Sequence, residues 1–262
     1  MSGSERAEVC VIIPTFNEAG TIGELIRALE GACGVFGMRL IVIDDGSGDG
    51  TLEIVRGISS DNGSIVLLER GEKLGLGSAI IEGMKTALSF IPPPDFVVTM
   101  DADMSHDPGA LPSMIKSCCA NGLVIGSRYV KGGKTIGWRS HRRIISGLAN
   151  LLARGLVGVE VRDCTSGYRC YHRDLVAGLL EDLGCDGYDF QIQALFEASR
   201  RASEIRELPI TFRDRESGES KLALGEVLRF ASQLYSLHRK RAGYAGSTQE
   251  VELPPRSLTV EK

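Results

Sequence analysis

The feature that most constrains this chain is a short apolar run that ends in two carboxylates. Residues 96–100 are apolar or β-branched and lead directly into Asp101 and Asp103, after which a Pro-containing turn follows. Such a run is typical of a buried strand in a parallel sheet, whose carboxyl end is where ligands bind. Two carboxylates repel each other unless a cation lies between them, so the pattern favours a divalent metal that holds a phosphorylated ligand. A solvated turn that caps the next helix is the simpler alternative.

The same unit of strand, polar turn and helix recurs along the chain. Predicted strands span residues 9–14, 40–43, 65–68, 96–100, 123–126 and 205–212, and predicted helices span residues 21–32, 52–58, 80–90, 108–119, 144–152, 188–201 and 222–241. Strands that alternate with helices in this way indicate right-handed βαβ units. We therefore expect an α/β fold with a mostly parallel sheet and helices on both faces.

Further acidic residues follow the first two predicted strands. Glu18 comes after the first strand and the pair Asp44 and Asp45 after the second, so the topology brings them to the edge that carries the first two carboxylates. A nucleotide fits such a crevice, because carboxylates accept hydrogen bonds from base and ribose and helix N-termini favour phosphate. Residues 44–47 also suit a plain turn and N-cap. The chain has no GxGxxG after the first strand and no GxxxxGK[ST], which disfavours an NAD(P)-type Rossmann domain and a P-loop NTPase.

Composition narrows the class of protein. The net charge of −4 argues against a general nucleic-acid binder. The seven cysteines form no CxxC pair and mostly lie in apolar settings, which indicates reduced thiols in the cytoplasm rather than a disulfide framework or a zinc site. Neither a signal peptide nor an apolar stretch of about 20 residues is evident. We expect one catalytic domain over residues 9–241, between disordered ends at residues 1–8 and 242–262.

The segment after Trp138 combines an apolar stripe with a basic start. Four basic side chains precede the stripe, and they oppose the helix dipole, so an anionic partner is expected. The stripe itself fits either an anionic lipid surface or the protein core. Its members fall at helical spacing and are Ile144, Ile145, Leu148, Leu151 and Leu152. A second charged stretch, residues 213–221, has no periodicity and is predicted to be a loop that closes over phosphates or is simply solvated.

Six motifs in series resemble those of the family-2 inverting glycosyltransferases. The motifs are PTFNE at 14–18, DDGS at 44–47 with DGT at 49–51, GLG at 75–77, DADMSH at 101–106, GSRY at 126–129 and GESKL at 218–222. Within that family the chain is most similar to the dolichol-phosphate (polyprenol-phosphate) mannosyltransferases, in a form without transmembrane helices. The resemblance extends over residues 9–240.

The resemblance implies the Rossmann-like nucleotide-diphospho-sugar transferase (GT-A) fold and the transfer of mannose from GDP-mannose to dolichyl or polyprenyl phosphate, with inversion and release of GDP. It implies Mg²⁺ or Mn²⁺ as the cofactor, with Asp101 and Asp103 as metal ligands. The residues expected to cradle the guanosine are Pro14, Phe16, Glu18, Ile43 and Asp45, and those beside the ribose and diphosphate are Asp101 and Ala102. The phosphate-contacting residues implied are Arg128, Arg215 and Lys221, which with Asp103 would form the catalytic set.

Physical chemistry is consistent with this division of labour. A phosphate monoester has a second pKa near 6 and is largely dianionic at pH 7, so it needs no general base. The difficulty is to bring it toward a sugar diphosphate. Two unit charges at about 4 Å repel by about 4 kcal/mol at an effective dielectric of about 20, so metal and guanidinium charges are needed.

Two positions depart from the pattern of relatives. Ser105 stands where some relatives carry Gln, and Ser146-Gly147 stands where many carry Ser-Arg, which leaves the nearby arginines as acceptor contacts. The candidates are Arg139, Arg142 and Arg143. Many relatives also have transmembrane helices, so we expect this chain to lie peripherally on the cytoplasmic face of a membrane. It would do so through residues 138–152, through the basic end near Arg239, or with a membrane-anchoring partner protein.

Other functions remain open at the level of sequence. A UDP-glucose-dependent polyprenyl-phosphate glucosyltransferase, or a family-2 enzyme with a soluble acceptor, would keep the fold and change the substrates. A non-catalytic nucleotide-sugar-binding subunit of a membrane complex would not require the acidic pair or the basic loop. A sugar nucleotidyltransferase would carry a glycine-rich, basic loop after the first strand, which this chain lacks.

Overall fold

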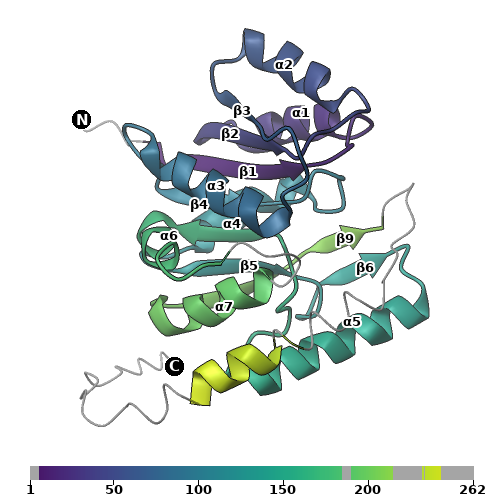
Figure 1. Ribbon diagram of the computed structural model, residues 1–262, viewed down its shortest axis with the longest axis vertical. Coiled ribbons are helices and arrows are strands. Elements are labelled where there is room, and N and C mark those ends of the chain that lie inside the picture. The colour runs from purple at the N-terminus through teal and green to yellow at the C-terminus, as the bar shows by residue number, and fades with distance from the viewer. Residues whose placement is uncertain (1–5, 185–189, 215–231, 233, 243–262) are drawn as a thin grey trace.

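The computed structural model describes residues 6–184, 190–214, 232 and 234–242 (Figure 1). The strands are β1 (Glu8–Thr15), β2 (Gly37–Asp44), β3 (Ile65–Glu69), β4 (Phe96–Thr99), β5 (Leu123–Ser127), β6 (Lys134–Ile136), β7 (Arg169–His172), β8 (Ile205–Pro209) and β9 (Thr211–Arg213). The helices are α1 (Ile22–Ala32), α2 (Thr51–Asp61), α3 (Leu76–Ser89), α4 (Leu111–Ser117), α5 (Ser140–Ala153), α6 (Arg173–Leu179) and α7 (Phe190–Arg201), with the short helical turns η1 (Pro108–Ala110) and η2 (Arg154–Gly158). The predicted domain limits at residues 9 and 241 remain predictions.

Seven of the described strands form one sheet in the order β3-β2-β1-β4-β7-β5-β8. β1 pairs in parallel with β2 and with β4, and β5 pairs in parallel with β8. β7 lies antiparallel between β4 and β5. The predicted α/β fold with a mostly parallel sheet is therefore confirmed. β7 was not predicted, because its four residues begin with an arginine and carry no strand periodicity.

The single strand predicted over residues 205–212 is instead two strands. β8 extends the large sheet, whereas β9 pairs with β6 in a separate two-stranded sheet. The chain passes from one sheet to the other at Ile210, whose N–H donates to Ser127 O and whose carbonyl accepts from Lys134 N–H. This crossing brings the segment before residue 214 next to the end of β5.

Helices cover both faces of the large sheet (Figure 1). α1, α2 and α4 pack on one face and α3, α6 and α7 on the other, each against its own apolar cluster. Alternate residues of β1 enter the two clusters: Val11 and Ile13 point to one, and Cys10 and Ile12 to the other. This central strand is buried on both sides, which explains its continuous apolar run.

The described part of the C-terminal segment, residues 234–242, is helical. Leu234 and Leu237 pack into the cluster beside α7, and Lys240 Nζ lies 2.6 Å from the fully buried carboxylate of Glu197. Among the described residues, no helix combines the length and the hydropathy needed to cross a bilayer.

α3 packs tightly on the sheet at Gly83. A Cβ at this position would lie 2.6 Å from Ile12 Cγ2 and 3.0 Å from Ile43 Cδ1. We expect Gly83→Ala to lower the free energy of unfolding by about 1–3 kcal/mol through overpacking. The control is Gly57→Ala in α2, where nothing lies within 4 Å of the added methyl and where better helix propensity should add about 0.5–1 kcal/mol. Urea unfolding followed by circular dichroism measures both, and equal effects would contradict the packing argument.

Candidate active site

The carboxyl ends of β1, β2 and β4 lie side by side. Thr15 at the end of β1 is opposite Asp44 at the end of β2, and Met100 N–H donates to Ile12 O across the β1–β4 pair at 3.2 Å. The turns that follow these strands therefore share one edge of the sheet, as the parallel topology requires.

The two neighbouring carboxylates after β2 have different environments. Asp44 is 1% exposed, and its Oδ1 accepts from the backbone N–H groups of Gly46 and Ser47 at 3.0 and 2.7 Å, so it builds the turn. Asp45 instead accepts from Gly75 N–H at 2.9 Å, and its Oδ1 lies 3.2 Å from Arg70 Nη1. The turn interpretation thus applies to Asp44, while Asp45 forms a nearly buried ion pair at the ligand-facing edge.

The other residues expected around a nucleoside lie on β1 and β2 and on the turn after β1. Phe16 is 39% exposed, and Lys73 Nζ lies 4.2 Å from the centre of its ring. Glu18 sits where α1 begins: its backbone N–H donates to Thr51 Oγ1 at 2.9 Å. Ile43 is fully buried in the core, so only its backbone is near the edge, where its carbonyl accepts from Thr15 Oγ1. Pro14, beside it in β1, is half-buried.

Asp101 and Asp103 lie on the turn after β4 and differ in exposure. Asp103 is 8% exposed, and its Oδ1 accepts from Ser105 N–H at 3.0 Å. The side chain of Asp101 is 36% exposed. Ala102 between them is buried. The Ser105 hydroxyl is buried without a hydrogen-bond partner in the described structure.

His106 packs against this turn as a neutral ring. Its Nδ1 accepts from Asp101 N–H at 3.3 Å, and its ring stacks on Tyr168 with centroids 5.1 Å apart. Burial holds the pKa of His106 below its ordinary value, despite the opposing effect of Asp101 and Asp103. The ring therefore adds no positive charge beside the acidic pair at pH 7.

Gly167 keeps open the space beside Asp101. A Cβ there would lie 3.2 Å from Asp101 Oδ1 and 3.5 Å from Gln191 Nε2, and the glycine is fixed by Thr99 Oγ1, which donates to its carbonyl at 2.8 Å. Gln191 is 6% exposed, and its Oε1 has no hydrogen-bond partner in the described structure. Sequence analysis did not single out this amide.

A divalent cation fits the acidic pair as an ion shared with a ligand. The described residues include no group of three or more His, Cys, Asp and Glu side chains arranged to hold a metal. Mg²⁺ characteristically takes one or two protein carboxylates and completes its shell with phosphate oxygens and water. Asp101 and Asp103 supply that number of ligands.

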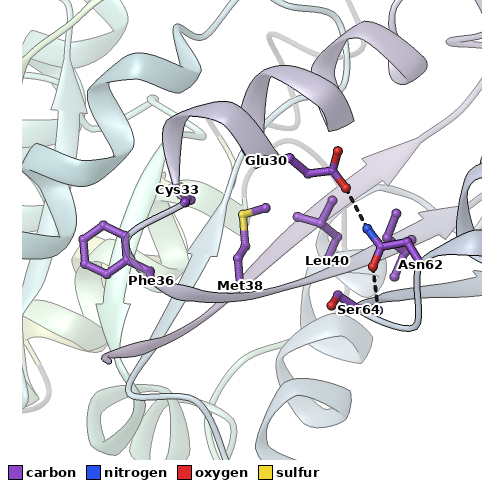
Figure 2. A pocket seen from close by; sticks show the side chains of 9 residues that line it. Glu30, Cys33, Phe36, Met38, Leu40, Asn62 and Ser64 are labelled. Atoms are coloured by element: carbon purple, nitrogen blue, oxygen red, sulfur yellow. Dashed lines mark hydrogen bonds between the residues drawn. The ribbon is translucent and has the colours of Figure 1, made fainter. Parts of the chain in front are cut away.

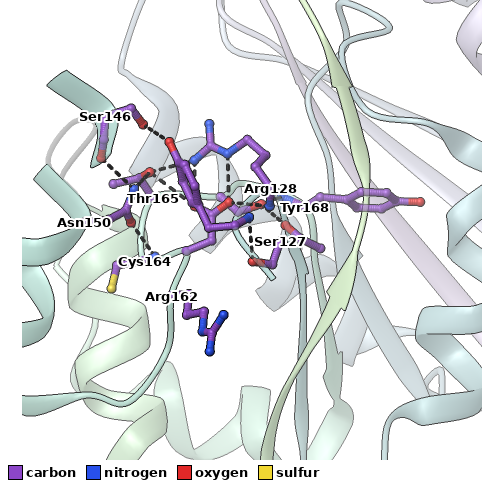
Figure 3. Close-up of polar contacts among 12 residues, drawn as sticks. Ser127, Arg128, Ser146, Asn150, Arg162, Cys164, Thr165 and Tyr168 are labelled. Atoms are coloured by element: carbon purple, nitrogen blue, oxygen red, sulfur yellow. Dashed lines mark hydrogen bonds and ion pairs between the residues drawn. The ribbon is translucent and has the colours of Figure 1, made fainter. Parts of the chain in front are cut away.

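Arg128 lies at the end of β5 and is held in a two-point ion pair (Figure 3). Its Nε and Nη2 donate to the two oxygens of Asp163 at 2.8 and 2.6 Å, and Nη2 also donates to Thr165 Oγ1 at 2.8 Å. Asp163 is fully buried, and the Arg128 side chain is 8% exposed. No described residue accepts from the remaining nitrogen, Nη1. Arg128 is thus a fixed donor with one arm left for a ligand.

Aromatic rings surround the same guanidinium. Its Cζ lies 5.2 Å from the ring centre of Trp138, 5.4 Å from that of Phe212 and 5.5 Å from that of Tyr129. Burial disfavours the Arg128 cation, but the hydrogen bonds and charge of Asp163 hold its pKa above the ordinary value. Because Asp163 balances its charge, Arg128 can orient a bound anion through hydrogen bonds but contributes little net positive charge.

The loop that carries Asp163 is supported from below by Arg169. This fully buried side chain donates to the carbonyls of Ser166 and Cys164 at 2.9 and 2.8 Å. From α5, Asn150 Oδ1 accepts from Cys164 N–H at 2.7 Å. Sequence analysis assigned no role to residues 163–169. Its one signal there was a dense run of Asp, Thr, Ser and Gly between predicted elements.

The basic residues at the start of α5 have an anionic partner, as expected from their unfavourable position at the positive end of the helix dipole. Arg142 pairs with Asp214 and lies over the Trp138 ring at 4.5 Å. Arg143 and Arg139 are exposed. Two residues of the predicted catalytic set, Arg215 and Lys221, fall outside the described residues.

A separate hollow of about 190 Å³ lies at the opposite edge of the sheet. It is lined by the end of α1 and the starts of β2 and β3, and Asn62 donates to Glu30 at 2.7 Å across its rim (Figure 2). None of the predicted site residues lines it.

Comparison with known proteins gives consistent results. Residues 10–180 match the sequence profile of the family described as Glycosyl transferase family 2. Undecaprenyl-phosphate mannosyltransferase of Micrococcus luteus is 38% identical over 220 residues, which cover 84% of this chain and 89% of that protein. Polyprenol monophosphomannose synthase of Mycolicibacterium smegmatis is 36% identical over 216 residues, which cover 81% and 80%.

Solved structures resemble the chain in fold. Glucosyl-3-phosphoglycerate synthase from Mycobacterium tuberculosis, in complex with Mn²⁺, UDP and glucosyl-3-phosphoglycerate, has a TM-score of 0.64 at 22% identity, over 91% of this chain and 80% of that one. The same enzyme in complex with Mg²⁺ and UDP has a TM-score of 0.63 at 22% identity, over 91% of this chain and 80% of that one. The expected GT-A fold is confirmed.

The buried ion pair of Arg128 generates a stability prediction. We expect Asp163→Asn to lower the free energy of unfolding by about 3 kcal/mol, because it leaves a buried cation without its counter-charge. The matched control is Glu69→Gln, which breaks the two-point pair of Arg56 and Glu69 on the surface and should have no measurable effect. Chemical denaturation measures both, and a stability of Asp163→Asn equal to that of the wild type would show that the pair is not a structural anchor.

Proposed function

The chain belongs to glycosyl transferase family 2, as its motifs predicted, and we propose that it transfers mannose from GDP-mannose to a polyprenyl or dolichyl phosphate. One observation carries the proposal: the loop of residues 163–169 passes beside Asp101 at Gly167, where a Cβ would lie 3.2 Å from Asp101 Oδ1, and accepts from Arg128 through Thr165. One loop thus connects an acidic pair suited to a metal with a guanidinium suited to a phosphate. The mannosyl and polyprenyl parts of the proposal are supported by the names of the two bacterial relatives.

We assign the nucleoside to the edge formed by the ends of β1 and β2. The residues assigned there are Pro14, Phe16, Glu18, Ile43 and Asp45. Within this set Asp45 offers carboxylate oxygens to the donor groups of guanine, and Arg70, whose Nη1 lies 3.2 Å from Asp45 Oδ1, holds that carboxylate in place. Asp101 and Ala102 would lie beside the ribose and diphosphate.

We assign Mg²⁺ or Mn²⁺ to Asp101 and Asp103. When bound, the ion would neutralise the diphosphate and stabilise the GDP that leaves. The complexes of the mycobacterial synthase with UDP and Mn²⁺ or Mg²⁺ support a metal in this fold.

The reaction proposed is a direct displacement. An oxygen of the acceptor phosphate forms a bond to the anomeric carbon of mannose, while the bond from that carbon to the β-phosphate oxygen breaks and GDP takes the electron pair. Attack from the side opposite the leaving group inverts the configuration. Since the acceptor is already anionic, no residue has to remove a proton.

The proposed cationic groups have different roles in binding the phosphates. Arg128 is already balanced by Asp163, so it orients a phosphate through Nη1. Net positive charge must come from elsewhere, and we assign that part to Arg215 and Lys221 together with the metal. Because the acceptor is a lipid, the enzyme would work peripherally at the cytoplasmic face of a membrane, alone or with an anchoring partner protein.

The test of the function is transfer of label into lipid. Purified protein is incubated with Mg²⁺ or Mn²⁺, a short polyprenyl phosphate in detergent, and radiolabelled GDP-mannose. We expect label in the organic phase, lost with a chelator and reduced at least about a hundredfold in Asp103→Ala, since the metal stabilises developing charge.

A parallel incubation with labelled UDP-glucose tests the donor. Transfer from UDP-glucose alone would keep the fold and replace the proposed donor with that of a polyprenyl-phosphate glucosyltransferase. Absence of transfer from either donor would reject the polyprenyl-phosphate assignment.

The proposed division among the cations predicts distinct defects. Arg128→Lys should lower turnover at least about tenfold, because a single ammonium group cannot replace a guanidinium that binds Asp163 and a phosphate at once. Arg215→Ala and Lys221→Ala should each lower turnover by a similar factor through loss of net charge. Steady-state kinetics in the label assay measures all three. Wild-type turnover in any of them removes that residue from the proposed catalytic set.

A further inference from the structure

α5 presents its apolar side chains to solvent. The apolar stripe, defined as Ile144, Ile145, Leu148, Leu151 and Leu152, is between 44% and 63% exposed. These residues share one face of the helix, and that face is directed away from both apolar clusters of the protein. An ordinary surface helix is oriented the other way.

Hydrogen bonds on the opposite face fix this orientation. Tyr129 Oη donates to Ser146 Oγ at 2.7 Å, and the 3% exposed Asn150 accepts from Cys164 N–H at 2.7 Å. Asn150 Nδ2 also lies 3.4 Å from Thr165 Oγ1. Rotating the apolar stripe into the protein would break these contacts, so its exposure is built into the packing of the helix.

The segment that carries the apolar stripe has only basic charged side chains, one of which, Arg142, is paired with Asp214. Residues 131–159 contain six Lys and Arg side chains and no Asp or Glu, whereas the whole chain has a net charge of −4. Arg139 and Arg143 at the start of α5 and Arg154 just after its end are exposed. Apolar side chains flanked by exposed arginines match the interface of a membrane that contains anionic lipid.

The same helix is part of the active site. Asn150 contacts the hydroxyl of Thr165, which accepts from Arg128, as Figure 3 shows. Figure 1 places α5 at the end of the molecule opposite α2. A phosphate that stays attached to a lipid can reach Arg128 only if the membrane surface lies near this end.

We propose that α5 is the membrane-docking element, with the apolar stripe among the headgroups of an anionic lipid surface and the polar face held against the Arg128 loop. This inference rests on the proposed function, since that function gives the chain a lipid-linked substrate. A second copy of the chain fits the stripe less well, because a symmetric contact would bring the same arginines face to face.

The experiment measures binding without any substrate. Wild-type protein is sedimented with vesicles of phosphatidylcholine, with and without phosphatidylglycerol. The double variant Leu148→Asp/Leu151→Asp places two charges on the stripe, and the matched control Val35→Asp changes an apolar residue that is 65% exposed at the other edge of the sheet. We expect wild type and control to bind the anionic vesicles, and the double variant to bind at least about tenfold more weakly.

A second readout identifies the face that docks. Trp138 is the only tryptophan in the sequence and lies two residues before α5. Energy transfer from Trp138 to a dansyl-labelled lipid should appear on binding of the wild type to anionic vesicles. Arg143→Gln and Arg154→Gln, at exposed positions that carry no apolar contact of the stripe, should weaken binding to anionic vesicles in a salt-dependent way.

Several outcomes would overturn the proposal. These are equal binding by the double variant and the wild type, no binding of the wild type to anionic vesicles, binding without energy transfer, and a wild-type dimer in sedimentation equilibrium that the double variant converts to monomer. The last result would assign the stripe to a second copy of the chain. Vesicle binding lost in the double variant, with no mannose transfer by the wild type, would retain the docking helix and reject the proposed function.

Discussion

The ion pair between Arg128 and Asp163 organises the part of the molecule where chemistry is expected. A buried guanidinium and a buried carboxylate are each costly to desolvate, and they are tolerated here because both oxygens and two of the guanidinium nitrogens are satisfied. The loop that supplies Asp163 must then keep one conformation, and Arg169 and Asn150 hold it there. The position of Gly167 beside Asp101 follows from that constraint.

In this arrangement, the group that can orient an anion is not the group that can supply net positive charge. Asp163 balances the charge of Arg128, whereas the neutral ring of His106 adds no positive charge beside Asp101 and Asp103. A reaction between a dianionic acceptor and a sugar diphosphate requires both orientation of the phosphates and neutralisation of their charge. In the proposed reaction the fixed guanidinium of Arg128 would orient a phosphate, and a metal together with Arg215 and Lys221 would supply the net positive charge. An active site built this way has little use for a general base.

Much of the site could be foreseen because it follows strands. Asp45, Asp101 and Arg128 each follow a strand of recognisable pattern, and these strands run in the same direction, which places the three residues at one edge of the sheet. Asp163, Gly167 and Arg169 could not be foreseen in the same way, because β7 enters the sheet antiparallel, between strands far from it in sequence. Gln191 reaches the space beside Asp101 from α7, and only the packing of that helix puts it there.

The amino-acid sequence alone indicated the α/β class, the alternation of strands and helices up to β5, the family and the spacing of the apolar stripe on α5. These are local properties, fixed by periodicity and by motifs a few residues long. Whether the stripe faces the core or the solvent depends on tertiary packing. A helical period states which side chains share a face, but whether that face meets the core depends on the partners of the other face. Here the polar side of α5 forms hydrogen bonds with Tyr129 and with the Cys164 N–H. The apolar side is therefore exposed to solvent.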